Sequence, residues 1–543
     1  MDGWKDPMPK EILPEETERL RADFLTMCSA QFGRMCSSDE QESLQTFEQR
    51  EDRAVEVGHS LAHWLLEKHV QLDSAAATSE DGLAHCPQCG RTAGPVSIDQ
   101  KEDERGVKTR VGEVTFRRIE YRCASCRRSF YPVDLALQLG TEGYSPNLLR
   151  KIEYAGGNAP SFAQGSAALH ALAELDISPK HVQRLTERLG RERAARRDAA
   201  VEAHRAGSLK PRHADPPAVV AIHVDAGKVQ TRTDDGVRGV RDPHWRDSKV
   251  ACLATYPATS YTTDPQPQPP AVFLDPPQVV RLCAELSRVR SGPPPPSPEA
   301  PPGAAFERGE PADAQQRQPR PLVRTAVATL GNTEAFGWLV SAEARLRNFY
   351  GASRRALLGD GGNWIGPLGD FHFPGWTQVL DFLHLLAHLY VAACCAYRTP
   401  RKPRWRQYTH LIREAWAGDV DAVLVRLRRL QRRIGPPPTN ALDDDPRRRL
   451  DRVIAHVEAN RVRMDYARYR REGLPITSTL VESLIKQFNQ RMKGTEKFWV
   501  DGGAEAVLQV RAALLSEDDR AAEHHRHRPI PRATGRGRLN SAA

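Results

Sequence analysis

Four cysteines in two Cys-x-x-Cys pairs constrain the fold more than any other feature of this sequence. The first pair, Cys86 and Cys89, lies in HCPQCG. The second pair, Cys123 and Cys126, lies in YRCASC after a gap of 33 residues. Two thiolate pairs on tight turns build a tetrahedral four-cysteine Zn²⁺ site. The alternating stretch VGEVTFRRIEYRC predicts strands between the pairs, so residues 81–140 are expected to form a zinc ribbon, in which the metal replaces a missing core.

The charge of the chain favours a polyanionic partner. The 543 residues carry a formal net charge of +9 with a pI near 9.1. Neutralising phosphates with Lys or Arg releases condensed counterions, so nucleic acid is the first candidate, and the ribbon is one element that can contact it. No apolar run approaches the ~20 residues of a membrane span, and the N-terminus is too polar for a signal peptide. We therefore expect a cytoplasmic, nucleoid-associated protein of several domains with no membrane partner.

Helical patterns lie on both sides of the expected ribbon. Residues 1–80 hold charged, amphipathic sequence that predicts an N-terminal region of packing or assembly helices. Residues 141–210 hold three helical segments, the last of which begins SPKHVQRLTERL with Ser178 as its N-cap. This arrangement fits a helix-turn-helix whose last helix offers Lys180 and Arg184 to DNA, although many helical bundles share the pattern.

Proline and arginine divide the remaining chain. Residues 264–321 include SGPPPPSPEAPPG, which predicts a disordered insertion with at most a short helix around VVRLCAELSRV. Residues 385–474 predict helices and hold 20 Lys plus Arg against 10 Asp plus Glu. We expect a basic helical insertion domain that lies along DNA or is only solvated. Residues 516–543 predict a disordered basic tail.

Two aspartates follow short apolar runs. Residues 219–224 predict a buried strand that ends at Asp225, and two small residues follow that would let a ligand come close. RRALLGDGG has the same pattern, a short apolar run followed by Asp360 and two glycines. WTQVLDFLH is a third apolar run, which ends with Asp381 and His384. Ligands bind at the strand ends of open sheets, so Asp225 and Asp360 are expected to converge there.

A third acid lies on a helix. In LVESLIKQFNQRMKGTEKFW the apolar residues follow helical spacing, and Glu482 lies on the adjoining polar face. Thr479 and Glu482 can form a capping box, with Lys486 as a surface ion-pair partner. Alternatively, Glu482 joins Asp225 and Asp360, as in the RNase H fold, where such a trio holds two Mg²⁺ ions ~4 Å apart. The residues of this helix expected to contact the phosphate backbone are Lys486, Asn489, Arg491 and Lys493.

The order of these motifs resembles a known family. Zinc knuckles, a helix-turn-helix pattern, LGDGGNWI, VLDFLH and VESLIKQFNQRMKGTEKFW follow one another as in the DDE transposases of bacterial insertion sequences, especially the ISKra group. The resemblance implies that Asp225, Asp360 and Glu482 are the metal-binding triad. Asp381 and His384 match an auxiliary Asp-x-x-His element of related transposases, and they can equally serve only to position the next helix.

We therefore expect a multidomain α+β protein with an RNase H-like α/β catalytic core, preceded by a zinc ribbon and a helix-turn-helix. The core is expected in residues 215–263 and 322–384, and residues 475–515 complete it after the helical insertion. The resemblance implies binding of terminal inverted repeats, then cleavage and strand transfer into target DNA with two Mg²⁺ (or Mn²⁺), by a homodimer or larger assembly. The alternatives are a transposase-derived DNA-binding regulator without catalysis and an RNase H-like nuclease.

Overall fold

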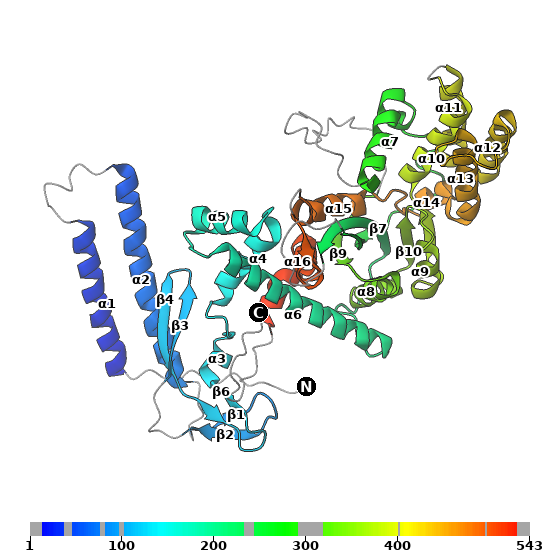
Figure 1. The fold of residues 1–543 in the computed structure, drawn as a ribbon. Coiled ribbons are helices and arrows are strands. Elements are labelled where there is room, and N and C mark those ends of the chain that lie inside the picture. The colour runs from blue at the N-terminus through cyan, green and yellow to red at the C-terminus, as the bar shows by residue number, and fades with distance from the viewer. Residues whose placement is uncertain are drawn as a thin grey trace. The chain divides into compact units, whose positions relative to one another are not determined.

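The computed structural model in Figure 1 describes residues 14–36, 46–76, 82–96, 103–232, 244–291, 319–399, 402–494 and 497–528. The protein is a mixed α+β structure that divides into two compact units. Unit 1 comprises Met1–Ile152, Leu169–Asp176 and Ala522–Ala543. Unit 2 comprises Glu153–Ala168 and Ile177–Ala521.

Unit 1 begins with two long helices, α1 (Pro14–Met35) and α2 (Phe47–Ala76), in the region predicted to be helical. The two helices pack together, and the ring centroids of Phe24 and Trp64 lie 5.6 Å apart where they meet.

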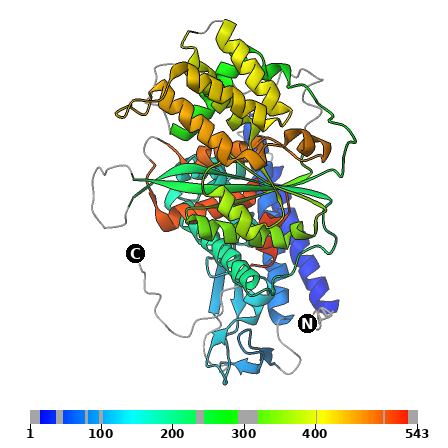
Figure 2. The ribbon, with the colours of Figure 1, turned by 90° about the vertical axis from the view of Figure 1, so that its right-hand side faces the viewer.

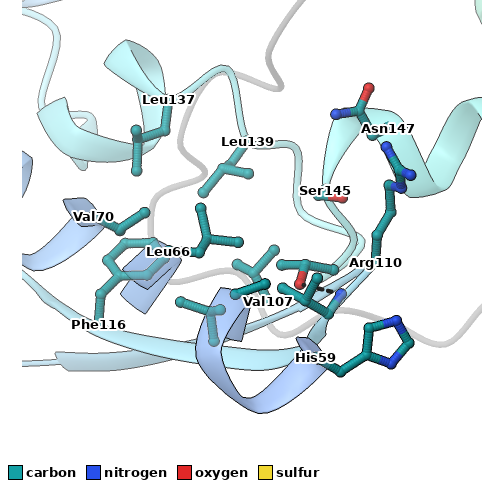
Figure 3. Close-up of a pocket in the computed structure, with 14 residues that line it drawn as sticks. His59, Leu66, Val70, Val107, Arg110, Phe116, Leu137, Leu139, Ser145 and Asn147 are labelled. Carbon is teal, nitrogen blue, oxygen red and sulfur yellow. Dashed lines mark hydrogen bonds between the residues drawn. The ribbon is translucent and has the colours of Figure 1, made fainter. Parts of the chain in front are cut away.

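An apolar pocket lies between α2 and a hairpin of two strands, β3 (Asp103–Thr109) and β4 (Gly112–Arg118) (Figure 3). Its volume is about 660 Å³, and most of its lining is aliphatic, including Leu66, Val70 and Leu139. One histidine and one arginine are the titratable groups of the lining. The pocket therefore offers no set of acids for metal-dependent chemistry.

A small antiparallel sheet carries the two cysteine pairs. Its strands, in spatial order, are β1 (Ala84–His85), β2 (Thr92–Pro95), β5 (Tyr121–Arg122) and β6 (Ser129–Phe130), and α3 (Pro132–Ala136) follows. Of the strands predicted between the pairs, β3 and β4 form their own hairpin outside this sheet. The apolar core of the small sheet contains Ala93, Tyr121 and Phe130 together with Cys86 and Cys123.

Three helices occupy the region where the sequence predicts a helix-turn-helix: α4 (Pro146–Asn158), α5 (Phe162–Ala173) and α6 (Pro179–Arg205). The Ser178 hydroxyl caps α6 by accepting a hydrogen bond from the His181 amide at 3.3 Å, so the predicted N-cap is confirmed. The middle of α6 packs on α16 (Asp501–Leu515), so closely that a Cβ on Gly190 would collide with the Ala506 carbonyl. Part of α6 therefore belongs to the core of unit 2, and the helix-turn-helix stays a prediction.

A mixed sheet forms the centre of unit 2. Its strands, in spatial order, are β11 (Thr377–Leu380), β10 (Arg354–Gly359), β7 (Val219–Arg232), β8 (His244–Tyr256) and β9 (Val323–Thr329). β7, β8 and β9 are antiparallel neighbours, whereas β10 and β11 run parallel to β7. Numbered along the chain, the five strands lie in the order 3-2-1-4-5 from β9 to β11. A short strand, β12 (Trp499–Val500), pairs with the far end of β7.

Helices cover both faces of this sheet (Figure 2). Even-numbered residues of β7 such as Ile222 pack with α8 (Thr333–Leu346) and α9 (Ile365–His372), and a 3₁₀ turn, η3 (Phe349–Gly351), precedes β10. Odd-numbered residues such as Ala221 pack on the other face with α10 (Phe382–Ala396). Farther along that face, Val229 packs with α15 (Thr479–Met492) and α16. Because side chains alternate along a strand, Asp225 belongs to the face that α10 and α15 cover.

The range in which the sequence predicts a helical insertion consists of α11 (Lys402–Trp416), α12 (Val420–Ile434), α13 (Pro446–Ala459), η4 (Arg461–Arg463) and α14 (Tyr466–Arg471). These helices pack with α10 around fully buried aromatic residues such as Trp416 and Tyr408. The Tyr466 hydroxyl donates to the Leu380 carbonyl at 2.9 Å. The helical domain is thereby fixed to the end of β11.

The Pro-rich segment is more ordered than predicted. Residues 264–291 contain a 3₁₀ turn, η2 (Ala271–Phe273), and helix α7 (Pro276–Ser291). The short helix predicted around VVRLCAELSRV is therefore present, and the prediction of disorder is wrong for the rest of this range. This segment is ordered because it packs against the helical domain. Phe273 packs on the aromatic core of that domain, and the Trp416 indole donates to the Gln266 carbonyl at 2.7 Å. The remainder of the Pro-rich run, residues 292–318, lies outside the described residues.

The predicted disordered tail also begins with ordered chain. Residues 516–528 include α17 (Arg520–Arg526), and the buried Arg520 pairs with Glu343 of α8 and with Asp518. Buried ion pairs of this kind hold the segment in place, which composition alone did not indicate. Residues 529–543 lie outside the described residues.

Candidate functional site

Three aspartates lie level on adjacent parallel strands: Asp360 and Asp381 directly follow the ends of β10 and β11, and Asp225 lies within β7. β7 and β10 pair in parallel, and continuing their register sets Asp360 level with Asp225. β11 pairs with β10 in the same way, which sets Asp381 level with Asp360. The Asp381 amide donates to the Gly359 carbonyl at 2.8 Å, so the pairing continues up to this level. Adjacent strands are ~4.8 Å apart, and the sheet therefore brings these acids together from distant parts of the sequence.

Asp225 lies within its strand and not at its end. β7 continues to Arg232 because its antiparallel neighbour β8 pairs with it along that length, whereas β10 ends at Gly359. Gly227, which was expected to let a ligand come close, instead lets α15 approach: a Cβ there would lie 3.4 Å from Ile485 Cγ2. The small residue therefore seats the helix that carries Glu482.

Glu482 points into the protein from the first turn of α15 and is 9% exposed. The capping-box alternative is wrong, because Thr479 is already inside the helix and the preceding Ser478 makes no side-chain cap. The Ser478 hydroxyl instead donates to Glu482 Oε1 at 3.2 Å. Lys486, the other suggested partner, pairs with Glu285 of α7 at 2.6 Å. The surface role considered for Glu482 is thus replaced by a buried one.

Asp381 connects two helices to the site. Its carboxylate is fully buried and accepts hydrogen bonds from the amides of Leu383 and His384 at the start of α10, at 3.4 and 3.1 Å. It also accepts from the Ser478 amide at 2.8 Å, just before α15, and from His384 Nδ1 at 2.5 Å. Both oxygens are therefore occupied, which supports the helix-positioning account of Asp381. Since Ser478 precedes Glu482 by one turn, Asp381 also sets where Glu482 lies.

His384 adds a cation to this group of acids. Its Nδ1 lies 4.0 Å from Glu482 Oε1, and ligand atoms of Asp381, His384 and Glu482 all lie within 4.8 Å of one another. Burial opposes the charged imidazolium, but the hydrogen bond and charge of Asp381, with the charges of Asp360 and Glu482, raise the pKa of His384 to about 9. Because Asp381 holds Nδ1, the nitrogen left to donate to a ligand is Nε2.

The carboxylates at this position repel one another. Burial, followed by the charges of Asp381 and Asp225, raises the pKa of Glu482 to about 7, although His384 and the Ser478 hydroxyl act in the opposite direction. Four acids with one histidine are short of positive charge, and a bound cation would supply it. The group formed by Asp381, His384 and Glu482 has the donor atoms to hold a metal ion.

Without added divalent ions, the protein is expected to lose stability as the pH rises from 4.5, the ordinary pKa of glutamate, to about 7, the pKa of folded Glu482. The folded state holds the proton more tightly than the unfolded chain, so the gain is complete below this window and gone above it, an effect of ~1–3 kcal/mol. Thermal unfolding followed at several pH values measures it. The Glu482→Gln variant, neutral at every pH, should lack this fall, and an equal fall in both proteins would contradict the assignment.

Two residues of the helical domain reach the site and were missed from the sequence. Gly361, directly after Asp360, has φ +80°, and a Cβ there would lie 2.7 Å from His456 Cε1 and 3.0 Å from Asn460 Nδ2. The ring of His456 in turn stacks on His388 with centroids 4.2 Å apart. Only the glycine after Asp360 signalled in the sequence that another segment comes this close.

The two cysteine pairs converge as predicted. Cys86 Sγ lies 3.5 Å from Cys126 Sγ, and Cys89 Sγ lies 3.6 Å from Cys123 Sγ. All four sulfurs lie within 4.8 Å of one another. A tetrahedral zinc site with Zn–S bonds of ~2.3 Å places sulfurs ~3.8 Å apart, so these cysteines can bind Zn²⁺ with small adjustments. The backbone N–H of Cys126 lowers the pKa of Cys123 to about 6, whereas, against the backbone N–H of Arg128, burial and the neighbouring thiols raise the pKa of Cys126 to about 11. One thiolate is therefore favoured within the group.

The two zinc knuckles differ at one matched backbone position. The residue after the second cysteine of each pair is left-handed, Gly90 with φ +71° and Arg127 with φ +57°. A side chain costs ~1 kcal/mol in that conformation, which corresponds to about fivefold in affinity. Arg127→Gly is therefore expected to tighten zinc binding about fivefold and Gly90→Ala to weaken it about fivefold, as measured by chelator competition. The same direction of change in both variants would contradict the argument.

The residues predicted to contact DNA have different environments. Lys180 and Arg184 are exposed on the first turns of α6. On α15, Lys486 is half exposed in its ion pair with Glu285, and Asn489 and Lys493 are partly buried. Burial and the nearby Lys228 lower the pKa of Lys493. Among the described residues, Lys486 has a protein ion-pair partner, and Lys180, Arg184 and Lys493 have none. Contact of these residues with DNA stays a prediction.

The prediction that Arg491 contacts DNA is wrong. Its side chain is 1% exposed, its Nε donates to the Gly156 carbonyl at 2.8 Å, and its guanidinium packs over the rings of Phe162 and Trp499. Position 491 lies three residues after Phe488, so it falls on the apolar stripe of α15 and not on the polar face. Arg491 therefore joins α15 to the end of α4 and the start of α5.

Comparison with models of known protein families and with curated protein sequences gives no match to this chain. Within the described residues, every helix is too short or too polar to pass through a membrane. The function therefore has to be argued from the geometry of the site.

Proposed function

We propose that this protein is a DNA transposase of an insertion sequence, which binds the element's ends, cleaves them in a metal-dependent reaction and transfers them to target DNA. One observation carries the proposal: Asp225 and Asp360 lie level on adjacent parallel strands, and their charges act on Glu482 and His384 in the helices that cover that face. Acids from three distant segments meet in this group although their mutual repulsion destabilises the fold.

The arrangement of the sheet supports an RNase H-like core. The strand order is 3-2-1-4-5, in which β7, β8 and β9 are antiparallel neighbours and β10 and β11 run parallel to β7. This is the arrangement expected for an RNase H-like sheet. The helical domain enters after β11 and returns directly before α15, as a domain inserted into such a core would. This likeness is one of fold, so the activity depends on the acids themselves.

Asp225, Asp360 and Glu482 would hold two Mg²⁺ (or Mn²⁺) ions, because hard cations prefer carboxylate oxygens. Such ions, when bound, activate the attacking oxygen and stabilise the leaving oxygen of a phosphodiester. Asp381 would position Glu482 through Ser478. His384 would present Nε2 to a phosphate oxygen, since Asp381 holds its Nδ1.

Other parts of the chain would place DNA at these acids. The zinc centre and the exposed Lys180 and Arg184 of α6 would bind the terminal inverted repeats, with a helix-turn-helix formed by the helices α4 to α6. Lys486 and Lys493 would contact the backbone near Glu482. Two subunits would be needed to bring two element ends together, in a protein that acts at the nucleoid of the cytoplasm.

The test uses labelled duplexes that carry the DNA flanking the coding region. The protein is expected to cut at the boundary of an inverted repeat with Mg²⁺ or Mn²⁺ and to join the released 3′ end to a plasmid. Cutting without joining would favour the nuclease alternative. Specific binding with no cutting under any divalent ion would favour the DNA-binding regulator.

A further inference from the structure

The outer surface of the helical domain contains two helices whose orientation can be derived. α11 and α12 are joined by a short turn, so they run antiparallel, and their apolar sides belong to one core. Glu414 of α11 pairs with Arg426 of α12, with Arg426 Nε 2.9 Å from Glu414 Oε2. These two residues therefore mark the side on which the helices face each other.

The remaining charges of both helices point away from the core. At ~100° per residue, the buried Leu411 and Ala415 lie to one side of Glu414 and the exposed Arg413 lies to the other. On α12, the buried Leu427 lies to one side of Arg426 and the exposed Arg429 lies to the other. Because the helices are antiparallel and share a core, both exposed sets face the same way. We call this surface the basic face, formed by Lys402, Arg406, Arg413, Arg429 and Arg432.

The basic face lacks compensating acids. Glu414 is neutralised by Arg426, and Asp421 at the start of α12 pairs with Arg461 at 2.5 Å. The five residues of the basic face form no ion pair with any residue that the structure describes. A chain of like charges without partners repels itself, so the folded domain keeps it at a cost that an external polyanion would offset.

We propose that the basic face lies along the phosphate backbone of duplex DNA. Lys402 and Arg413 are eleven residues apart, ~16 Å along a helix, which matches the rise of about five base pairs along the duplex axis. The face offers no buried aromatic anchor of the kind that dominates protein interfaces, and its long cations suit phosphates and not base edges. The contact would therefore be independent of sequence. This inference rests on the proposed function, since that function brings duplex DNA to unit 2.

The test compares two charge-reversed variants with the same change in net charge. In the face variant, Arg413→Glu with Arg429→Glu, the affinity for duplex DNA is expected to fall at least tenfold. The slope of log affinity against log salt should also shrink by ~2, since each lost phosphate contact removes ~0.9. The control variant, Arg428→Glu with Arg452→Glu, changes exposed arginines of the same domain that are already paired with Glu458 and Asp443, and should bind within about twofold of the native protein.

Fluorescence anisotropy without divalent ions measures binding, and circular dichroism checks folding. If the face variant does not fold, Arg413→Gln with Arg429→Gln replaces it. This variant changes the charge half as much, so the logarithm of its affinity for DNA is expected to fall about half as far. Native binding by the face variant, or equal losses in both variants, would overturn the proposal. Assays of cleavage and joining distinguish this proposal from the proposed function. If only the face variant binds DNA more weakly, but the native protein never cuts DNA, the basic face is supported and the proposed activity is not.

Discussion

Replacing Glu482 with glutamine is expected to lower metal-dependent DNA cleavage and joining by at least ~1000-fold, a change of ~4 kcal/mol in the barrier. The substitution keeps the size and the Ser478 hydrogen bond of the side chain but removes one negative charge from a buried group of acids. Hard cations bind neutral amides far less well than carboxylates, so the loss should fall on metal-dependent chemistry. Asp360→Asn is expected to behave in the same way.

DNA binding distinguishes this result from general damage. Glu482→Gln should bind duplex DNA within about twofold of the native protein, because the side chain lies away from the surface. The matched control is Glu285→Gln. It removes a carboxylate of α7 that pairs with Lys486, a residue of the same helix as Glu482, and should leave cleavage within about threefold of the native rate. Cleavage at the native rate by Glu482→Gln would remove the acid from the mechanism. Equal losses in the control would show that any change near α15 suffices.

Strand ends were the most predictable part of the site. A short apolar run followed by an acid and glycine indicated Asp360, and an apolar run that ends in an acid indicated Asp381, because such patterns are local in the sequence. For Asp225 the predicted position in the strand was wrong. How far β7 continues depends on β8, which pairs with it from a different segment, and pairing of this kind cannot be seen in the apolar run itself.

Helix faces were predictable where the apolar stripe was read to its end. The stripe of α15 correctly placed Val481, Leu484 and Phe488 in the core. Continued by three residues it includes Arg491, whose charge concealed its buried position. The orientation of Glu482 depended on contacts no local pattern contains, since Ser478 and Asp381 hold that turn from outside the helix. Partners remote in sequence likewise order α7 and the start of the predicted tail.

Substituting Cys123 with serine is expected to abolish zinc binding and to unfold the small sheet from β1 to β6. Apart from its buried cysteines, the apolar core of that sheet contains Ala93, Tyr121 and Phe130, far fewer residues than a metal-free domain needs. Zinc bound by four thiolates contributes ~10–16 kcal/mol to the folding of small domains, so little structure should remain without it. Zinc content by elemental analysis and amide hydrogen exchange over residues 84–130 measure the two effects.

The proposed function adds a third consequence of losing zinc, which separates recognition from chemistry. If this sheet binds the terminal repeats, Cys123→Ser should lose preference for repeat DNA while the acids of unit 2 still cut DNA without preference, because the two groups of ligands lie in different units. Cys28→Ser in α1 is the matched control, since this cysteine of unit 1 lies outside the zinc group and should change neither zinc content nor preference. A variant that keeps its zinc, or keeps protected amides after losing it, would show that the fold of this sheet does not depend on the metal.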